Sequence, residues 1–324
     1  MTTPTSKKTI TILGATGAQG TGVARTFLSN PLFHVRAVTR NPSSAAAQAL
    51  SSLGAELVKA DLNDPSTLPR ALAGSHVIYG VTDFFEPFAR YKSAEKAMEV
   101  EVGQGVNLAR AAAGVEGLEH FIWSTLPDGR GLSEGRVTVP HFEGKNRVER
   151  YIKEKDPGLL EKTTFLWVAW YHDNYRFPMF TPVWVPSAGK FVQLGNYEGE
   201  VPISTIGDVR ANVGRFVEKV VEQPGKTQGG RVVFASSEVR TAREMLGTWA
   251  RVKGVEAQFV RVSGEAFREL WPLWGEEMGV MMELWDEFRE RSWTDAEGRE
   301  VLTKEDLGVQ GLQSLEEAFK GLEL

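Results

Sequence analysis

The chain contains no cysteine among its 324 residues. Disulfide bonds, thiolate metal sites and cysteine nucleophiles are therefore excluded, which agrees with a reducing compartment such as the cytoplasm. An excess of positive charge is also missing, because 37 Lys and Arg stand against 42 Asp and Glu for a formal net charge of -5. The chain as a whole is not attracted to phosphate backbones, so we expect no direct binding of nucleic acid.

Long hydrophobic runs are lacking as well. A membrane-spanning helix needs about 18 or more consecutive apolar residues, and the sequence offers no such run. The apolar run Ile10–Leu13 follows a polar start and ends at Gly14, which makes it too short for the core of a signal peptide. We therefore expect no membrane span and no secretion signal, and we predict a cytoplasmic protein.

Tyrosine is scarce beside the other aromatic residues, with six Tyr against nine Trp and 17 Phe. Large side chains gather in two segments of the second half, at Trp170, Tyr171, Tyr175, Phe177, Phe180 and Trp184, and at Phe267, Trp271, Trp274, Met278, Met281, Met282, Trp285 and Phe288. Core packing, the lining of an apolar pocket and a surface for a protein partner are three explanations for them. The exposure of Trp271 and Trp274 separates the first explanation from the other two.

The first half of the chain alternates short β-branched runs with helical segments, which is typical of βα units around a parallel sheet. The predicted strands are Thr9–Leu13, His34–Thr39, Ala55–Ala60, His76–Val81, His120–Ser124 and Thr163–Trp170. The predicted helices are Gly20–Leu28, Ser43–Leu53, Pro65–Ala73, Ala89–Ala113 and Phe142–Lys155. We therefore predict an α/β fold with a doubly wound parallel sheet.

After Trp170 this rhythm breaks, because the stretch Tyr171–Tyr197 is aromatic and rich in proline, which predicts an insertion that leaves the sheet. Further predicted elements are helices at Asp208–Val221 and Ala242–Lys253, strands at Arg231–Ala235 and Gln258–Val262, and a helical segment Gly264–Arg291 that Pro272 breaks. At roughly 100–200 residues per domain, the length suits one large α/β domain with an elaborated end or two domains that share a cleft. No Gly/Ser linker separates the halves, so we predict an interdigitated C-terminal domain and divide the chain at residue 170. Residues 171–324 would return strands to the sheet and form a smaller substrate or lid domain.

A glycine-rich loop joins the first predicted strand to the first predicted helix. It reads Gly14-Ala15-Thr16-Gly17-Ala18-Gln19-Gly20, with the spacing G-x-x-G-x-x-G. Glycine permits a tight turn and a close approach of the backbone, and the N–H groups and dipole of the new helix bind a pyrophosphate. A plain turn would also use glycines, but this loop heads a run of βα units. We therefore predict a dinucleotide in the domain 1–170, with Gly14, Thr16, Gly17, Ala18, Gln19 and Gly20 as contacts.

Residues that follow the next three predicted strands complete this site. An NAD enzyme usually carries an acid at the end of the second strand, whereas an NADP enzyme carries a base near the 2′-phosphate. The second strand here runs into Arg40, which favours NADP, although such an arginine can also be merely solvated. Asp61 and Leu62 follow the third strand as candidate adenine contacts, and Asp64 can cap the next helix. Thr82 follows the fourth strand as a cofactor contact or a loop cap.

Several segments together resemble the NmrA-like family of atypical short-chain dehydrogenase/reductases over nearly the whole chain. They are Gly14–Gly20, Val38–Arg40, Asp61–Leu62, Val81–Phe84, Glu101–Gly105 and His141–Lys145. The resemblance implies a Rossmann domain that binds NADP(H), a smaller C-terminal domain and a cleft between them. The family divides between NADP-binding sensors, which regulate protein partners and can have access to the nucleus, and reductases, often of secondary metabolism.

The resemblance also places the catalytic question at His141 and Lys145. Active short-chain dehydrogenases carry Tyr-x-x-x-Lys, in which Lys holds the nicotinamide ribose and helps Tyr to pass a proton. Here Lys145 is present, but His141 takes the Tyr position. Ser124 resembles the polar residue at this strand end in the wider superfamily. Ser124 and Lys145 could therefore orient a carbonyl group without any Tyr.

Three side chains could replace the missing Tyr. His141 could act as a general acid or base if it faces the cleft, or it could be an exposed residue at a helix start. Lys145 could itself transfer the proton, as Lys does in the related isoflavone-reductase-like enzymes, or it could only bind the cofactor. Tyr171 supplies a phenol, but in the family its segment lies beside the nicotinamide. Tyr171 and Asn174 are therefore better candidates as cofactor contacts.

From these residues we predict an NADP(H)-dependent oxidoreductase without a metal site. Its substrate would be a bulky apolar carbonyl, imine or enone, aromatic or polycyclic, and Lys145, His141 or an ordered water would handle the proton. The alternative is a non-catalytic NADP-binding redox sensor that regulates a protein partner such as a transcription factor. The aromatic segments favour the enzyme, and the missing Tyr favours the sensor.

Overall fold

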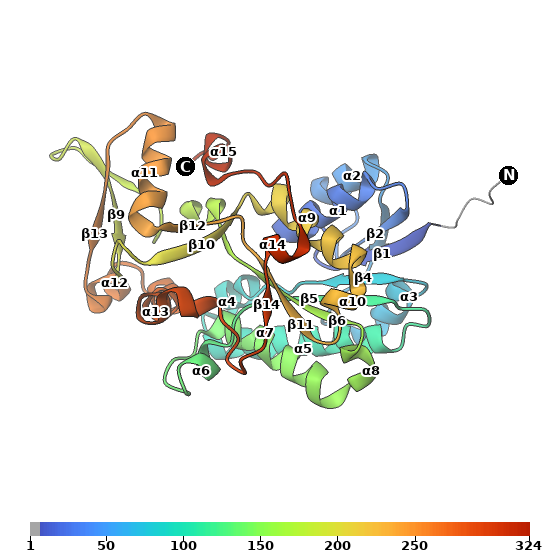
Figure 1. Ribbon diagram of the computed structural model, residues 1–324. Coiled ribbons are helices and arrows are strands. Elements are labelled where there is room, and N and C mark those ends of the chain that lie inside the picture. Colours follow the sequence, from blue (N-terminus) through green and yellow to red (C-terminus); the bar gives the residue numbers. More distant parts are fainter. Residues whose placement is uncertain (1–6) are drawn as a thin grey trace.

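An eight-stranded parallel sheet forms the centre of the computed structural model, which describes residues 7–324 (Figure 1). The strand order is β14-β11-β6-β5-β4-β1-β2-β3. The strands are β1 (Lys8–Ile12), β2 (Phe33–Thr39), β3 (Glu56–Lys59), β4 (Val77–Gly80), β5 (His120–Thr125), β6 (Thr163–Val168), β11 (Arg231–Ala235) and β14 (Val301–Leu302). The order reverses between β1 and β4, and sheets of this kind bind ligands outside the carboxyl ends of the strands at that point. The predicted doubly wound α/β fold of Rossmann type is confirmed.

Helices cover both faces of the sheet, which explains why its central strands are apolar on both sides. All residues of β5 and β6 are buried. Figure 1 shows α1 (Ala18–Leu28) and α9 (Val209–Glu222) above the sheet, and α5 (Ala94–Ala113) and α7 (Pro140–Lys155) below it. Shorter helices of this part are α2 (Ala45–Ser52), η1 (Pro65–Thr67), α3 (Leu68–Leu72), α6 (Gly129–Leu132), α8 (Pro157–Leu160) and α10 (Pro224–Thr227).

One predicted helix of the first half is interrupted. The segment Ala89–Ala113 contains the end of α4 (Phe85–Tyr91) and the whole of α5. Lys92 stops α4 because it adopts the left-handed conformation, with a φ of 51°. Ser93 then starts α5, because its side chain accepts a hydrogen bond from the N–H of Lys96. The break frees α4 to pack over the site described below.

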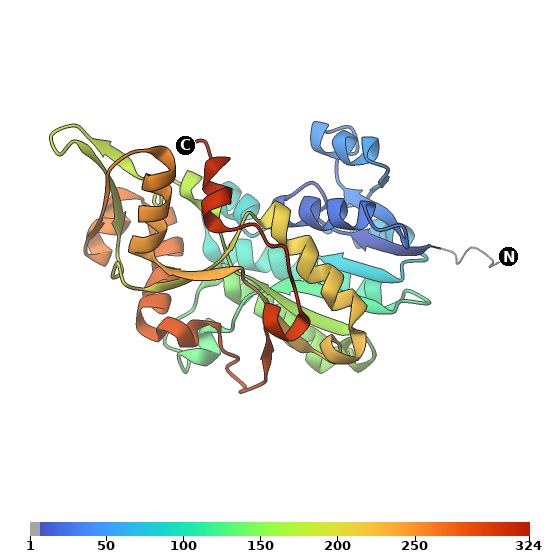
Figure 2. The same ribbon diagram turned by 45° about the horizontal axis from the view of Figure 1, so that its top comes forward.

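The second half builds a smaller lobe with two three-stranded sheets, β12-β10-β7 and β13-β9-β8 (Figure 2). Its strands are β7 (Trp170–Tyr171), β8 (Val183–Val185), β9 (Lys190–Gly195), β10 (Pro202–Gly207), β12 (Glu238–Thr241) and β13 (Ala257–Arg261). Its helices are η2 (His172–Arg176), α11 (Ala242–Lys253), α12 (Gly264–Leu270), α13 (Trp274–Phe288) and η3 (Arg289–Trp293). The predicted break at Pro272 is confirmed, since this residue lies between α12 and α13.

The two halves of the chain are interdigitated. The strand predicted to reach Trp170 ends at Val168, and Trp170 instead begins β7, which pairs with β10 of the smaller lobe. Strand β11 of the second half returns to the main sheet beside β6, and β14 pairs with β11 at the edge. The chain continues through α14 (Lys304–Leu307) and α15 (Leu315–Lys320). The division at residue 170 stays a prediction.

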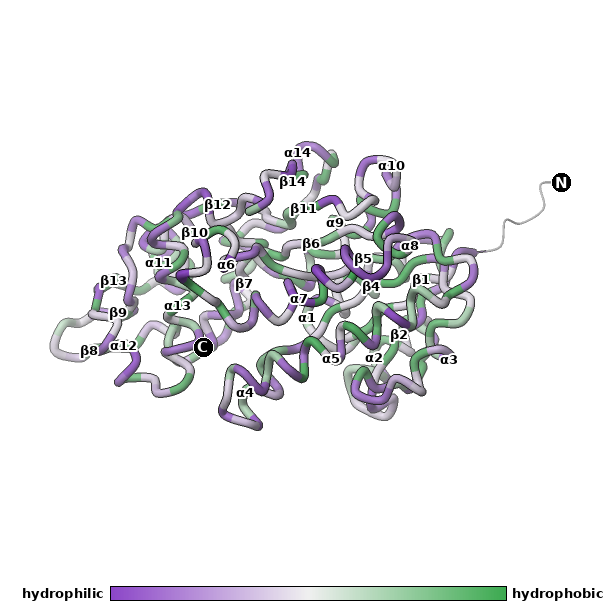
Figure 3. Tube along the Cα trace, turned by 90° about the horizontal axis from the view of Figure 1, so that it is seen from below, coloured by the Kyte–Doolittle hydropathy of each residue, from purple (hydrophilic) through white to green (hydrophobic). Residues whose placement is uncertain are grey.

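Most of the aromatic side chains in the second half belong to the core. Phe267 and Trp285 are fully enclosed, whereas Trp271 and Trp274 are only partly buried. Trp184 is the most open of the group and is 48% exposed. Hydrophobic segments, drawn green in Figure 3, include strands of the main sheet in the interior of the molecule. Within residues 7–324, every helix is too short or too polar to span a bilayer.

The buried histidine at the start of β5 predicts how stability depends on pH. Burial lowers the pKa of His120 to about 4, while an unfolded chain protonates His at about 6.5. The unfolded state therefore binds the extra proton first, and stability present above pH 6.5 is lost as the pH falls toward 4. The difference of pKa corresponds to about 3 kcal/mol.

Urea unfolding at about pH 7 and about pH 4.5 measures this loss. We expect His120→Gln to show a smaller fall in the free energy of unfolding between the two pH values than the wild type shows. The same fall in both proteins would contradict the assignment to His120.

Candidate functional site

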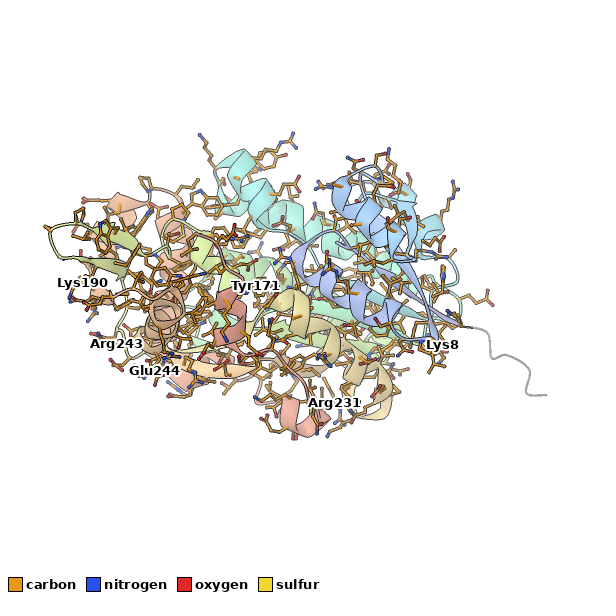
Figure 4. The ribbon with its side chains drawn as sticks, turned by 90° about the horizontal axis from the view of Figure 1, so that it is seen from above. Lys8, Tyr171, Lys190, Arg231, Arg243 and Glu244 are labelled. Atoms are coloured by element: carbon orange, nitrogen blue, oxygen red, sulfur yellow. The ribbon has the colours of Figure 1, made fainter. Side chains whose placement is uncertain are left out.

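One cavity of about 580 Å³ lies at the carboxyl ends of the main-sheet strands, and residues of both lobes line it. Every residue predicted for the site lines this cavity: Gly14, Thr16, Gly17, Ala18, Gln19, Gly20, Arg40, Asp61, Leu62, Thr82, Ser124, His141, Lys145, Tyr171 and Asn174. Figure 4 shows Tyr171 in the middle of the molecule, between Lys8 near one end and Lys190 near the other. The fold therefore brings together residues that are far apart in the sequence.

The glycine loop at one end of the cavity has the geometry of an anion site. Gly14 has a φ of +67°, and a Cβ on it would lie 2.8 Å from Val81 Cγ1. A Cβ on Gly20 would lie 2.2 Å from the Gly14 carbonyl oxygen. Helix α1 begins at Ala18 rather than at Gly20 as predicted, so the loop is shorter than expected. Its N-cap Gly17 provides no side-chain cap, and the first turn carries no acid, which leaves helix N–H groups for an anion.

A cluster of hydroxyl groups surrounds the side chain of Gln19 in the first turn of α1. Its Nε2 donates to the Tyr171 hydroxyl at 2.5 Å, and its Oε1 accepts from Ser124 Oγ at 2.7 Å and from the hydroxyl of Tyr79. Burial raises the pKa of both phenols, so Tyr79 and Tyr171 remain protonated. The cluster ties the glycine loop to β4, β5 and β7.

Lys145 is held by a buried ion pair. Its Nζ donates to Glu101 Oε1 at 2.5 Å, to the Thr82 carbonyl at 3.0 Å and to Thr82 Oγ1 at 3.1 Å. The Glu101 side chain is 0% exposed and also accepts from Thr82 Oγ1 at 2.8 Å. Helix α7 can approach this closely because Gly144 has no Cβ, which would lie 2.5 Å from Glu101 Oε2. An ammonium group has three N–H donors, so these contacts occupy all of them.

His141 lies at the start of α7 and lines the cavity. Its Nδ1 lies 2.5 Å from Glu277 Oε1, which comes from α13 of the smaller lobe. The two side chains are 7% and 1% exposed. The rings of Phe85 and Phe142 pack against the imidazole, at 5.4 and 4.8 Å between centroids. Of the two sequence-based alternatives, the structure places His141 in the cleft and not on the surface.

Arg40 also lines the cavity and forms a two-point ion pair with Glu86 of α4. Its Nη1 and Nη2 donate to Glu86 Oε1 and Oε2 at 2.8 and 2.6 Å. This hydrogen-bonded contact raises the pKa of Arg40 and lowers that of Glu86. Both side chains are more than half exposed, so the pair contributes little to stability. An incoming anion can therefore displace Glu86 from Arg40.

Two acidic residues, Asp61 and Asp64, follow β3, and the predicted helix cap by Asp64 is confirmed. Asp64 caps η1, because its side chain accepts from the N–H of Ser66. Asp61 Oδ1 accepts from the backbone N–H and the side-chain amide of Asn63, at 2.9 and 3.0 Å. Asp61 lines the cavity, but these bonds already engage one of its oxygens.

The end of the cavity beyond His141 is apolar. It is lined by Phe85, Phe177, Met278, Met281, Trp285 and Trp293, from α4, the insertion, α13 and η3. Trp271 and Trp274 do not line it. The aromatic segments therefore serve mainly the core and contribute a minority of their members to the cavity.

Sequence reasoning missed three carboxylates that contact the predicted residues: Glu86 on Arg40, Glu101 on Lys145 and Glu277 on His141. Glu101 stands in a segment that carries the family resemblance, which is the one available signal. Glu86 and Glu277 follow aromatic stretches and look like ordinary solvated acids. Within residues 7–324, no three His, Asp or Glu side chains come close enough together to hold a metal ion.

The sequence of the chain matches those of known proteins over most of its length. The profile of the NmrA-like family matches residues 6–312. The NmrA-like family domain-containing oxidoreductase hkm9 of Aspergillus hancockii is 34% identical over 270 residues, which cover 79% of this chain and 76% of that protein.

Solved structures share the fold at lower identity. The negative transcriptional regulator NmrA in complex with NADP has a TM-score of 0.74 at 20% identity, covering 98% of this chain and 96% of that chain. The NADPH-dependent quinone oxidoreductase QOR2 of Escherichia coli, complexed with NADPH, has a TM-score of 0.67 at 18% identity, covering 96% and 98%.

Proposed function

The chain belongs to the NmrA-like family, and from that premise we propose that it is an NADP(H)-dependent oxidoreductase that reduces a bulky apolar carbonyl, imine or enone. One observation carries the proposal. A single cavity connects an uncapped helix N-terminus behind a glycine loop with an apolar, aromatic end, and His141 lies along it. An anion site, a group able to transfer a proton and an apolar pocket are the three elements that such a reduction needs.

The residues of the first end fit a dinucleotide. The loop Gly14–Gly20 would hold the pyrophosphate, because its glycines permit a tight turn that leads into the uncapped N–H groups of α1. Arg40 would bind the 2′-phosphate, and Asp61 with Leu62 would contact the adenosine. When bound, the reduced nicotinamide supplies a hydride to the substrate. The NADP and NADPH bound to the structural neighbours support the same class of cofactor.

Lys145 and His141 take different roles in this proposal. The three acceptors around Lys145 Nζ leave it no N–H for a substrate, so it acts through Thr82, which it holds in the cavity wall. His141 keeps Nε2 for the cavity, since its Nδ1 is bound to Glu277. His141 therefore gives the proton that the substrate oxygen or nitrogen needs.

The apolar end of the cavity supports a flat and bulky substrate. Phe85 and Phe177 lie on one side, 6.0 Å apart between ring centroids, and Trp285 with Met278 and Met281 lines the same cavity. Aromatic and thioether side chains pack well against planar apolar molecules. Aromatic and polycyclic ketones, such as those of secondary metabolism, therefore match the pocket better than small polar ones.

Oxidation of NADPH in the presence of a panel of polycyclic ketones, with small aliphatic ketones as the matched controls, tests the function. We expect turnover with members of the first group and little with the second. Equal turnover of both groups would contradict the apolar specificity.

A redox sensor remains a second candidate, because the chain carries His141 in place of Tyr and shares its fold with the transcriptional regulator NmrA. In that case the smaller lobe would bind a protein partner, and the oxidation state of the bound nicotinamide would decide the affinity for that partner. Tight binding of NADPH without turnover of any ketone in the panel would favour this function.

The position of Arg40 predicts a preference for NADPH over NADH. Replacing Arg40 by Asp removes a charge-assisted contact to the 2′-phosphate, worth roughly 1.5–3 kcal/mol. We expect the affinity for NADPH to fall about 10- to 100-fold, while the affinity for NADH stays nearly unchanged. Glu86→Gln is the control: it removes the competing carboxylate, so NADPH should bind more tightly. Equal losses for both dinucleotides in Arg40→Asp would contradict the role of Arg40.

A further inference from the structure

We propose that Glu277 is a positioning residue that keeps Nδ1 of His141 protonated and leaves Nε2 as the nitrogen that serves the cavity. This inference rests on the proposed reductase function, but the NMR experiment that tests it requires no substrate. Glu277 belongs to α13 of the smaller lobe and His141 to α7 of the sheet domain. The contact therefore joins the two lobes at the cavity.

Two hydrogen bonds fix the imidazole. Glu277 Oε1 accepts from Nδ1 at 2.5 Å and from the backbone N–H of His141 at 3.2 Å. That N–H belongs to the first turn of α7, whose N-cap Val139 provides no side-chain cap. A carboxylate is favourable at such a helix N-terminus. One oxygen of Glu277 therefore caps α7 and orients the ring at the same time.

Nε2 is left for the cavity. Among residues 7–324, no side chain or backbone group forms a hydrogen bond with Nε2. The atom is not enclosed by protein either, since it is not one of the buried polar atoms that lack a partner. The ring itself lines the cavity. The aromatic rings of Phe84, Phe85 and Phe142 hold the imidazole between them. Rotation that would exchange the two nitrogens is therefore hindered.

A carboxylate suits this position for a chemical reason. The side-chain oxygen of a glutamine could also cap α7, and a buried charge is costly unless it is fully paired. Glu277 Oε2 nevertheless has no partner in the described part of the chain. Nδ1–H donates in both the neutral and the protonated ring. The bond to Glu277 therefore persists while Nε2 gains or loses its proton.

The proton step follows from this arrangement. As the carbonyl carbon of the substrate accepts the hydride, the Nε2–H bond breaks and a new O–H bond forms on the carbonyl oxygen. The ring is left neutral with Nδ1–H on Glu277, and solvent reprotonates Nε2 through the cavity. The charged residues that line the same cavity are Arg40, Asp61, Asp83, Glu86 and Lys145.

Nitrogen-15 NMR of the histidine side chains tests the inference without any substrate. The chain has only five His, and a His141→Gln spectrum identifies the His141 signals. At a pH where the ring is neutral, we expect Nδ1–H in the wild type. We expect a shift to Nε2–H or to a mixture in Glu277→Leu, and no change in Glu276→Gln, which serves as the matched control. A wild-type ring with Nε2–H, or a Glu277→Leu ring unchanged from the wild type, would overturn the proposal.

Glu277→Gln covers the case in which Glu277→Leu does not fold, because the amide keeps the size and the helix cap. We expect its kcat to fall about tenfold or more, with KM and the affinity for NADPH nearly unchanged. Unchanged kcat would also overturn the proposal. A wild-type ring with Nδ1–H in a protein that turns over no ketone would instead count against the reductase function alone.

Discussion

Replacing Lys145 by Met is expected to lower the free energy of unfolding by about 3–5 kcal/mol and to abolish turnover. The loss of stability follows from Glu101, which is 0% exposed and would be left as a buried charge without its cation. The loss of turnover follows because Thr82, which lines the cavity, loses the group that orients it. Urea unfolding measures the first effect, and NADPH oxidation the second.

A double variant separates these two effects. In Lys145→Met/Glu101→Leu both buried charges are gone, and replacing an ion pair by apolar side chains is often neutral for stability. We therefore expect the double variant to regain most of the stability of the wild type and none of its turnover. A single Lys145→Met protein as stable as the wild type would show that Lys145 and Glu101 do not form the buried pair.

His141→Gln is expected to lower kcat by about 10²–10⁴-fold, the usual contribution of a positioned general acid or base. Glutamine approximates the size of the imidazole and can still hydrogen-bond to Glu277, but it does not transfer a proton near neutral pH. The affinity for NADPH, measured by calorimetry, should stay within about threefold, because the anion site lies at the glycine loop.

The matched control is His172→Gln. His172 is also buried and its Nδ1 lies 3.1 Å from the Gly207 carbonyl oxygen, but it does not line the cavity. We expect normal kcat in that variant. A kcat for His141→Gln that stays within tenfold of the wild type would remove His141 from the proton transfer and leave that role to an ordered water.

The parts of the site that are contiguous in sequence could be predicted, and those that depend on packing could not. The loop Gly14–Gly20 and Arg40 can be identified from the sequence, because strand, turn and helix follow each other directly along the chain. Glu277 meets His141 across 136 residues, and Glu101 meets Lys145 across 44. No local pattern encodes which carboxylate reaches which cation, since tertiary packing decides it.

The fold shows the same division. The alternation of strands and helices predicted the main sheet, because each βα unit carries its own hydrophobic period. The interruption between α4 and α5 was missed, although Ser93 is a good N-cap, because the apolar period continues across Lys92. The pairing of Trp170 with β10 was missed as well, since a long apolar strand gives no sign of where its neighbours change.

Transfer of deuterium from the nicotinamide to the substrate tests the proposed reductase function. The protein is incubated with NADPH that carries deuterium at the transferable position and with the polycyclic ketones of the panel, and the products are analysed by mass spectrometry. We expect an alcohol or reduced enone that contains one deuterium, formed by the wild type and about 10²–10⁴-fold more slowly by His141→Gln. Tight binding of NADPH without a deuterated product from any ketone would contradict the reductase function and would leave the redox sensor as the function of this cavity.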